Sequence, residues 1–145
     1  MLDKISKKIL AELQNDGRIS NVELAARVGL TPPPCLRRVK RLEAEGVITG
    51  YRAVLDPAAA GRAFEVIIAV DIRATDRRTV EEFEAGVVAF DEVVAVRRLF
   101  GQPDYFVHVA VADAAAFEAF QMNKLIGLPA VARAVSHQTM KRIKD

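Results

Sequence analysis

The first apolar positions of the chain are spaced at helical intervals. Between residues 3 and 16, polar residues separate apolar ones that recur every four positions, namely Ile5, Ile9 and Leu13. This spacing puts the apolar side chains on one face and predicts an amphipathic helix. A second helix is predicted from Ser20, which stands three residues before Glu23 in the pattern of a capping box. Gly29 then tolerates the positive φ with which helices commonly end before a sharp turn.

A third helix is predicted to begin at Pro34 and to run to Glu45. In the run from Thr31 to Pro34, each of the first three residues precedes a proline and is pushed away from the α region. Proline itself suits the first position of a helix, because its missing N–H has no intrahelical partner there. The apolar residues of this segment form one stripe. The basic residues stay on the surface, where Arg37, Arg38 and Arg41 are expected to share a face.

Residues 47–55 switch to period two around Gly50, which predicts a short β-hairpin, or wing. Three short helices, of which the third is basic and exposed, followed by a wing, are typical of a winged helix-turn-helix whose last helix enters the major groove of DNA. A solvated basic face and, for Tyr51, simple packing are the alternatives. The predicted DNA-binding residues are Pro34, Arg37, Arg38, Lys40, Arg41, Tyr51 and Arg52.

The rest of the chain alternates strand and helix. Alternation over residues 64–72 predicts a strand with one buried face, and Asp76 and Asp113 can each cap a helix. Three more strands are predicted, over residues 93–100, 104–111 and 131–143. Two βαβ units in tandem predict an α+β fold, a ferredoxin-like βαββαβ sandwich with both helices on one face of the sheet. An apolar open face would favour self-association.

The segment between these two parts lacks periodicity and contains Pro and Gly, so it is predicted to be a linker. The expected domains are a DNA-binding domain over 1–55, a linker over 56–63, and a ferredoxin-like domain for effector binding and oligomerisation over 64–145. The basic and acidic side chains are also distributed unevenly between the two parts of the chain. Residues 1–52 hold ten basic and six acidic side chains, whereas the remainder holds eleven and thirteen. A basic head on a nearly neutral body is typical of a nucleic-acid-binding protein.

Composition narrows the class of protein. Of the 145 residues, 51% are hydrophobic and 28% are charged, which excludes a disordered chain. A single cysteine, Cys35, and two separated histidines, His108 and His137, give neither a disulfide framework nor a metal-ligand cluster. No metal or cofactor is therefore expected. The charged amino terminus and the absence of an apolar run of ~20 residues predict a cytoplasmic protein without membrane contact.

Three stretches, Leu30–Ile48, Phe100–Tyr105 and Leu128–Val131, occur in the order typical of one family. With them, essentially the whole chain resembles the Lrp/AsnC family of leucine-responsive, or feast/famine, transcriptional regulators. The resemblance implies a winged helix-turn-helix with its recognition helix on residues 34–45, and a carboxy-terminal domain that binds a small effector, usually an amino acid. It also implies dimers, often assembled into octamers. Such a dimer would place two recognition helices in successive major grooves, about 34 to 36 Å apart.

The resemblance also implies an effector site. It places Gly101 and Asp104 on the family's Gly-x-x-Asp motif, which lies near the interface between dimers in relatives. Many relatives have Ser or Thr just before the motif glycine, whereas this chain has Phe100 and lacks that hydroxyl. Gly101 and Asp104 also suit an ordinary hairpin turn. The effector-binding residues implied by the resemblance are Phe100, Gly101, Gln102, Asp104, His137, Gln138 and Thr139.

Enzymatic motifs are absent from the sequence. There is no nucleophile elbow, phosphate loop, dinucleotide-binding glycine pattern or paired-histidine motif. We therefore expect a regulator and not an enzyme. The leading enzymatic alternative is a tetrapyrrole (sirohaem) decarboxylase, since proteins similar to this family carry out that reaction. A second alternative is an effector-sensing module without DNA binding, which the arginines of the third helix argue against.

Overall fold

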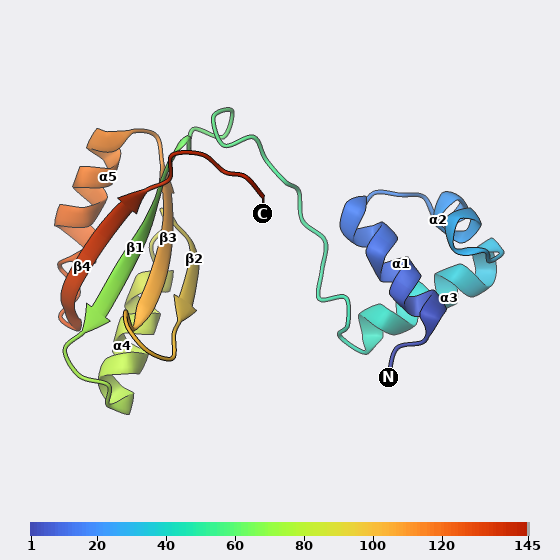
Figure 1. Cartoon of the computed structure of the whole chain (residues 1–145), viewed down its shortest axis with the longest axis horizontal. Coiled ribbons are helices and arrows are strands. Elements are labelled where there is room, and N and C mark those ends of the chain that lie inside the picture. The colour runs from blue at the N-terminus through green and yellow to red at the C-terminus, as the bar shows by residue number, and fades with distance from the viewer. Residues whose placement is uncertain (145) are drawn as a thin grey trace. The chain divides into compact units, whose positions relative to one another are not determined.

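The computed structural model describes residues 1–144. The chain divides into two compact units, Met1–Val54 and the part from Leu55 onward (Figure 1). Each unit has its own cluster of buried apolar side chains. The amino-terminal unit holds three helices and the carboxy-terminal unit holds a sheet with two helices packed on it, so the predicted α+β class is confirmed.

The three helices of the amino-terminal unit are α1 (Lys4–Asn15), α2 (Asn21–Val28) and α3 (Pro32–Ala44). The Ser20 side chain caps α2 by accepting the Glu23 N–H at 3.1 Å, and Gly29 ends it with φ of 75°. These two predictions are confirmed. The Glu23 carboxylate pairs with Arg27. The helices enclose a core that consists of Ile9, Leu24, Ala25, Val28, Cys35 and Leu42.

Two predictions for this unit are wrong. Helix α3 begins at Pro32 and not at Pro34, because the fixed φ of proline fits a first helical turn in which no N–H is needed. The extended backbone is confined to Thr31. The β-hairpin predicted over residues 47–55 is absent, and no strand lies between Ala44 and Phe64. The apolar side chains of Val54 and Leu55 are 88% and 65% exposed, and the segment with the period-two pattern pairs with no strand among residues 1–144.

The carboxy-terminal unit follows the predicted βαββαβ order. Its elements are β1 (Phe64–Ile72), α4 (Arg77–Val88), β2 (Val93–Arg98), β3 (Tyr105–Val111), α5 (Ala114–Phe120), a π-helical turn η1 (Gln121–Leu125) and β4 (Val131–Gln138). All pairs are antiparallel in the order β2-β3-β1-β4, which confirms the ferredoxin-like sheet. Strand β4 ends at Gln138, so its predicted extension to Ile143 is wrong: the pairing with β1 ends near Glu65, where β1 itself begins.

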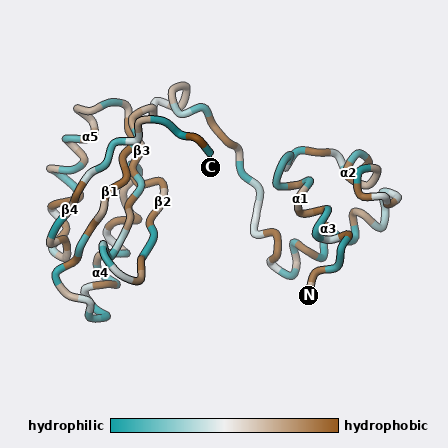
Figure 2. The backbone as a smooth tube through the Cα atoms, in the orientation of Figure 1, coloured by the Kyte–Doolittle hydropathy of each residue, from teal (hydrophilic) through white to brown (hydrophobic). Residues whose placement is uncertain are grey.

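The core of this unit lies between the helices and one face of the sheet. Val66, Ile68 and Val70 of β1 are at most 1% exposed, as the alternating pattern predicts. Figure 2 shows the hydrophobic residues along the central strands β1 and β3. Phe83 of α4 is fully buried, with its ring centroid 4.6 Å from that of Tyr105. Burial, followed by a hydrogen bond to Glu84, raises the pKa of Tyr105 to about 12.

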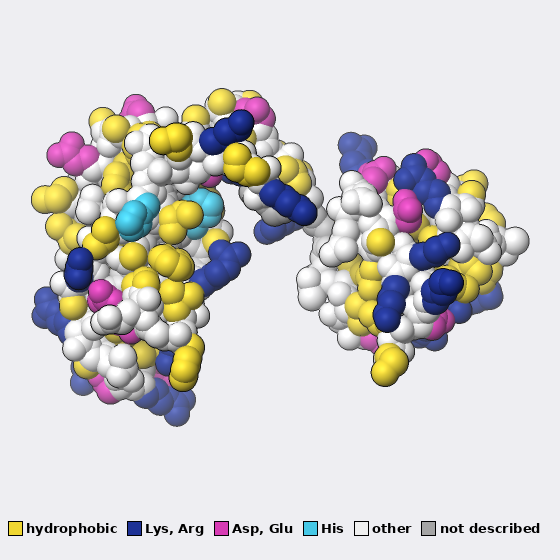
Figure 3. Space-filling view, viewed as in Figure 1, with side chains coloured by type: hydrophobic (Ala, Val, Ile, Leu, Met, Phe, Trp, Pro, Cys, Tyr) yellow, Lys and Arg dark blue, Asp and Glu magenta, His cyan; other side chains and the backbone are white. Residues whose placement is uncertain are grey.

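The opposite face of the sheet is not covered by other elements of the carboxy-terminal unit. Ile67 of β1 and Phe106 of β3 are 39% and 38% exposed. Ile67 is paired with His108 on one side and with His137 on the other. Figure 3 shows both histidines among hydrophobic side chains on the visible face of this unit. The open face is therefore a mixed apolar and titratable surface, of a kind that suits contact with another protein surface.

Candidate DNA interface and effector loop

Helices α2 and α3, joined by the Gly29 turn, form a helix-turn-helix. The Asn21 Nδ2 group donates to the Pro32 carbonyl at 2.8 Å and so ties the start of α3 to the start of α2. Farther along α3, Arg37, Lys40 and Arg41 are exposed. Their spacing of three and four residues places them on one face. Basic side chains are gathered on the visible surface of this unit in Figure 3. A rigid helix thus presents three cations to solvent.

These three cations are largely free of partners. Within residues 1–144, the Arg37 and Lys40 side chains make no ion pair or hydrogen bond. The Arg41 Nε lies 3.7 Å from a Glu45 oxygen, and the Arg41 side chain is 58% exposed. An exposed ion pair of this kind contributes little to stability, so Arg41 can readily exchange Glu45 for a DNA phosphate.

Arg38 behaves differently from its neighbours. Its Nη1 donates to Asp3 Oδ2 at 2.6 Å and to the Ser6 hydroxyl at 3.3 Å, and its side chain is 28% exposed. Arg38 therefore joins α3 to the first turn of α1. The Arg38 guanidinium is thus held by Asp3, which is 35 positions away in sequence. Asp3 and Ser6 are neighbours of α3 that local patterns did not reveal.

The Asp3→Asn variant is expected to be less stable than the wild type near neutral pH. The Ser6 N–H and then Arg38 hold the pKa of Asp3 below its ordinary value of 3.8. The stabilising contribution of the carboxylate is thus complete above that value and is lost as the pH falls through the lowered pKa. Asparagine still caps a helix, so only the charge is removed. Urea unfolding near pH 7 and at pH about 2 measures the difference. A difference that stays constant with pH would contradict this role.

Tyr51 and Arg52 follow α3 in the extended segment. The Tyr51 hydroxyl donates to Glu43 at 2.9 Å, and its ring packs beside Gly17, where an added Cβ would lie 3.5 Å from Tyr51 Cδ1. Burial, then Glu43, raises the pKa of Tyr51. This geometry supports the packing alternative for Tyr51. The Arg52 side chain is exposed. Pro34 is half-buried in the first turn of α3.

The Gly-x-x-Asp segment forms the loop between β2 and β3. Gly101 has φ of 128°, in a region that favours glycine, and the peptide bond from Gln102 to Pro103 is cis. The Phe100 side chain is fully exposed. Asp104 Oδ2 accepts the Ile72 N–H at 2.9 Å, so one carboxylate oxygen holds the loop against the end of β1. The second oxygen of Asp104 makes no side-chain hydrogen bond among residues 1–144.

His137, Gln138 and Thr139 lie at the other end of the sheet. The Thr139 N–H donates to the Glu65 carbonyl at 2.8 Å, next to the start of β1. Ile72 lies seven positions after Glu65 along β1, which corresponds to roughly 23 Å of strand. Within one chain, the structure therefore does not bring these three residues together with the loop of Gly101 and Asp104.

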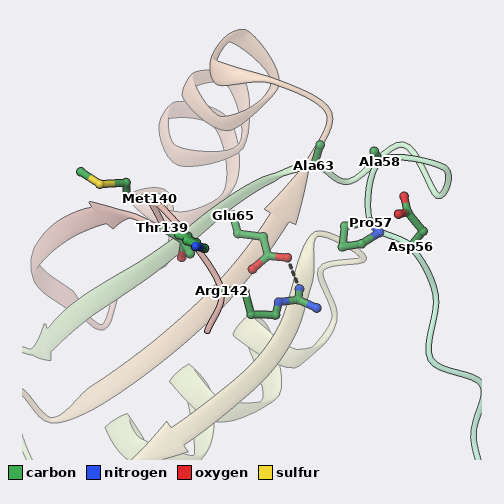
Figure 4. Close-up of a pocket in the computed structure, with 9 residues that line it drawn as sticks. Asp56, Pro57, Ala58, Ala63, Glu65, Thr139, Met140 and Arg142 are labelled. Atoms are coloured by element: carbon green, nitrogen blue, oxygen red, sulfur yellow. Dashed lines mark hydrogen bonds and ion pairs between the residues drawn. The ribbon is translucent and has the colours of Figure 1, made fainter. Parts of the chain in front are cut away.

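Glu65 is a charged residue that the sequence analysis did not single out. Its side chain is 10% exposed, it pairs with Arg142, and one oxygen lies 3.6 Å from His108 Nε2. Figure 4 shows Glu65 and Arg142 pointing toward each other at a surface cavity of about 320 Å³, with Pro57 and Asp56 across from them. A carboxylate on the same face of β1 as the apolar Ile67 and Ala69 is the signal that could have revealed it. Arg142 thereby fastens the segment after β4 to the sheet.

Residues 1–144 lack two further features, a metal-binding cluster and a membrane-spanning helix. His, Cys, Asp and Glu side chains do not gather there in groups of three that could hold a metal ion. None of the helices in the described part of the chain combines the length and apolar character that a bilayer-spanning segment needs. Cys35 is buried in the amino-terminal core, and burial raises the pKa of its thiol.

Two protein families match the two units. Residues 2–49 match the winged helix-turn-helix DNA-binding family, and residues 65–145 match the Lrp/AsnC ligand binding domain. The second match alone covers more than half of the chain.

Curated relatives and solved structures agree with these matches. The leucine-responsive regulatory protein of Haemophilus influenzae is 40% identical over 99% of this chain and 87% of its own length. That of Escherichia coli K12 is 38% identical over 99% and 88%. A transcriptional regulator of Neisseria meningitidis, crystallised as a complex with L-Met, has a TM-score of 0.95 and 39% identity, covering 100% of this chain and 94% of its own. An AsnC family regulator of Agrobacterium tumefaciens has a TM-score of 0.93 and 33% identity, covering 99% and 94%.

These relatives are regulators, which decides between the functions that the sequence left open. A helix-turn-helix with an exposed basic helix is joined to a domain that matches a ligand-binding family over its whole length. The matched relatives are named as regulatory proteins, and this favours the regulator over the tetrapyrrole decarboxylase. The chain belongs to the Lrp/AsnC family of DNA-binding transcriptional regulators.

Proposed function

We propose that this regulator binds its DNA target through α3 and that an amino acid controls the binding. The observation that carries the first part is the set of three exposed cations on one face of α3, namely Arg37, Lys40 and Arg41. Arginine can take two acceptors of a guanine or a phosphate at once, whereas a lysine acts as a point charge. Arg37 and Arg41 are therefore divided between base edges and phosphates, and Lys40 contacts a phosphate. Arg52 adds a phosphate contact from the segment after α3.

The DNA-bound species is a two-fold dimer in this proposal. The open face of the sheet, with Ile67 and Phe106 exposed, supports pairing of two carboxy-terminal units. Two α3 helices of such a dimer would occupy successive major grooves about 34 to 36 Å apart and would read an imperfect palindrome. Dimers assemble further, as the family resemblance implies, into octamers. The bacterial relatives are DNA-binding regulators, which supports a cytoplasmic location for this one.

The effector in this proposal is an amino acid bound at the loop between β2 and β3. The free oxygen of Asp104 can accept the effector ammonium, and N–H groups of the loop around Gly101 can hold its carboxylate. The relative from Neisseria meningitidis was crystallised with L-Met, and this supports the choice of ligand class. Because His137, Gln138 and Thr139 lie at the far end of the sheet in the same chain, a second copy would have to supply them to the loop.

The test of effector control uses the twenty amino acids, one at a time. At least one is expected to change the affinity for a selected duplex by about 5- to 150-fold, and the oligomer distribution with it. Fluorescence anisotropy measures the first quantity and light scattering after gel filtration the second. The Asp104→Asn variant keeps an acceptor for the Ile72 N–H but loses the charge, so it should fold and lose the response. Unchanged affinity and unchanged assembly with every amino acid would refute effector control.

A further inference from the structure

The first turn of α3 has almost no hydrogen-bond donors. Pro32, Pro33 and Pro34 carry no backbone N–H, and the N–H of Cys35 donates to the Thr31 carbonyl at 3.3 Å. The Cys35 thiol is buried in the core. This turn therefore cannot grip a phosphate or a base acceptor with its backbone, as the start of a helix otherwise can. What it offers to a ligand is apolar surface.

Leu36 is the large side chain on this surface. It is 42% exposed and belongs neither to the buried core of the unit nor to the apolar residues packed against that core. Pro33, three positions earlier, and Lys40, four positions later, are exposed neighbours on the same side of the helix. A single exposed leucine is ordinary on a protein surface. Leu36 differs in its position, because it stands directly before Arg37 on the helix that carries the exposed cations.

The first residues of a recognition helix are those that meet base edges in the major groove. Among the groups on those edges, the C5-methyl of thymine is the apolar one, and apolar side chains read it by contact. We infer that Leu36 is a specificity-determining residue that recognises a thymine methyl group, beside the contacts of Arg37. The inference rests on the proposed placement of α3 in the groove.

The test removes the thymine methyl group from the DNA and the Leu36 side chain from the protein in separate experiments. A preferred duplex is first selected with the full-length protein from a random pool. Each thymine of that duplex is then exchanged for deoxyuridine, which lacks only the methyl group. One thymine in each half-site should be sensitive to the exchange. Exchanging it in a single half-site should weaken binding of the wild type by about threefold to fivefold, which is the effect of losing one buried methyl-sized group. The Leu36→Ala variant should bind the two duplexes equally and should keep its response to the other positions.

Two control variants test whether the loss of thymine preference is specific to Leu36. Val22→Ala removes another exposed apolar side chain of the same unit, 67% exposed on α2, and should keep the wild-type preference for thymine. Arg37→Gln should bind more weakly and yet keep that preference. Circular dichroism establishes that Leu36→Ala is folded, and the deoxyuridine series on the wild type needs no variant at all.

Three outcomes would overturn the inference. Equal binding of the wild type to every thymine and deoxyuridine duplex would do so, as would a thymine preference that survives in folded Leu36→Ala. Either result leaves the proposed function standing, because a specific duplex is still bound. Failure of the wild type to enrich any duplex from the pool would refute sequence-specific binding itself, and the inference with it.

Discussion

A variant with glutamine at Arg37, Lys40 and Arg41 is expected to bind DNA more weakly than the wild type, by a factor that is about 4000 times larger in ~0.1 M salt than in ~1 M salt. Each phosphate contact made by a cation releases counterions and adds about 0.9 to the slope of log affinity against log salt. The two α3 helices of a dimer lose four such contacts, those of Lys40 and one arginine in each helix, so the slope falls by about 3.6. Glutamine retains the length and the helix propensity of the replaced residues. Anisotropy of a labelled duplex over a salt series measures both quantities.

The matched control for this variant lies in the other unit. Arg73, Arg77 and Arg78 are exposed, and their replacement by glutamine changes the net charge by the same amount. This control should bind DNA as the wild type does, with the same salt slope. Equal losses in the two variants would mean that net charge alone attracts the duplex, and the assignment of α3 as the DNA-contacting helix would fail.

The Phe83→Ala variant is expected to destabilise the carboxy-terminal unit by about 3 to 5 kcal/mol, the usual cost of emptying a large aromatic site. Phe83 is fully buried and packs on Tyr105, so its removal leaves a cavity between α4 and the sheet. The amino-terminal unit has a separate core and should keep its stability. Hydrogen exchange measures the stability of each unit separately. Amides of β1 and β3 should lose protection, whereas those of α1 and α2 should not.

Val88→Ala is the control on the same helix. The Val88 side chain is 65% exposed, and its truncation should change the free energy of unfolding by less than about 0.5 kcal/mol. If Phe83→Ala lowers the protection of both units equally, the chain unfolds as one cooperative body, which would contradict the assignment of independent cores.

Local signals in the sequence were sufficient where a structure depends on near neighbours. Ser20, Asp76 and Asp113 each cap a helix by accepting an N–H three positions later. The alternation from Phe64 to Ile72 predicts which face of β1 is buried because a strand has a period of two. The prediction of a wing was wrong because a strand does not depend on near neighbours alone. Residues 47–55 have the period of a strand, but a strand also needs a partner for its hydrogen bonds.

The candidate site was harder to predict than the fold. Arg37 and Arg38 are neighbours in sequence, and local patterns do not show that Asp3, 35 positions away, pairs with Arg38. Glu65 and Thr139 are 74 positions apart in sequence, yet they are joined where β1 meets the end of β4. Contacts over such separations leave no periodic trace in the chain. The exposure of Arg37, Lys40 and Arg41, by contrast, was predicted by helical geometry.

The burial of Cys35 has a consequence for how this regulator responds to its surroundings. Peroxide and other thiol oxidants attack the accessible thiolate, and here the sulfur is both enclosed and held in its protonated form. Oxidants would therefore leave the thiol of the amino-terminal unit unaltered. Since Cys35 is the sole cysteine, thiol oxidation offers no route to inactivation of this regulator.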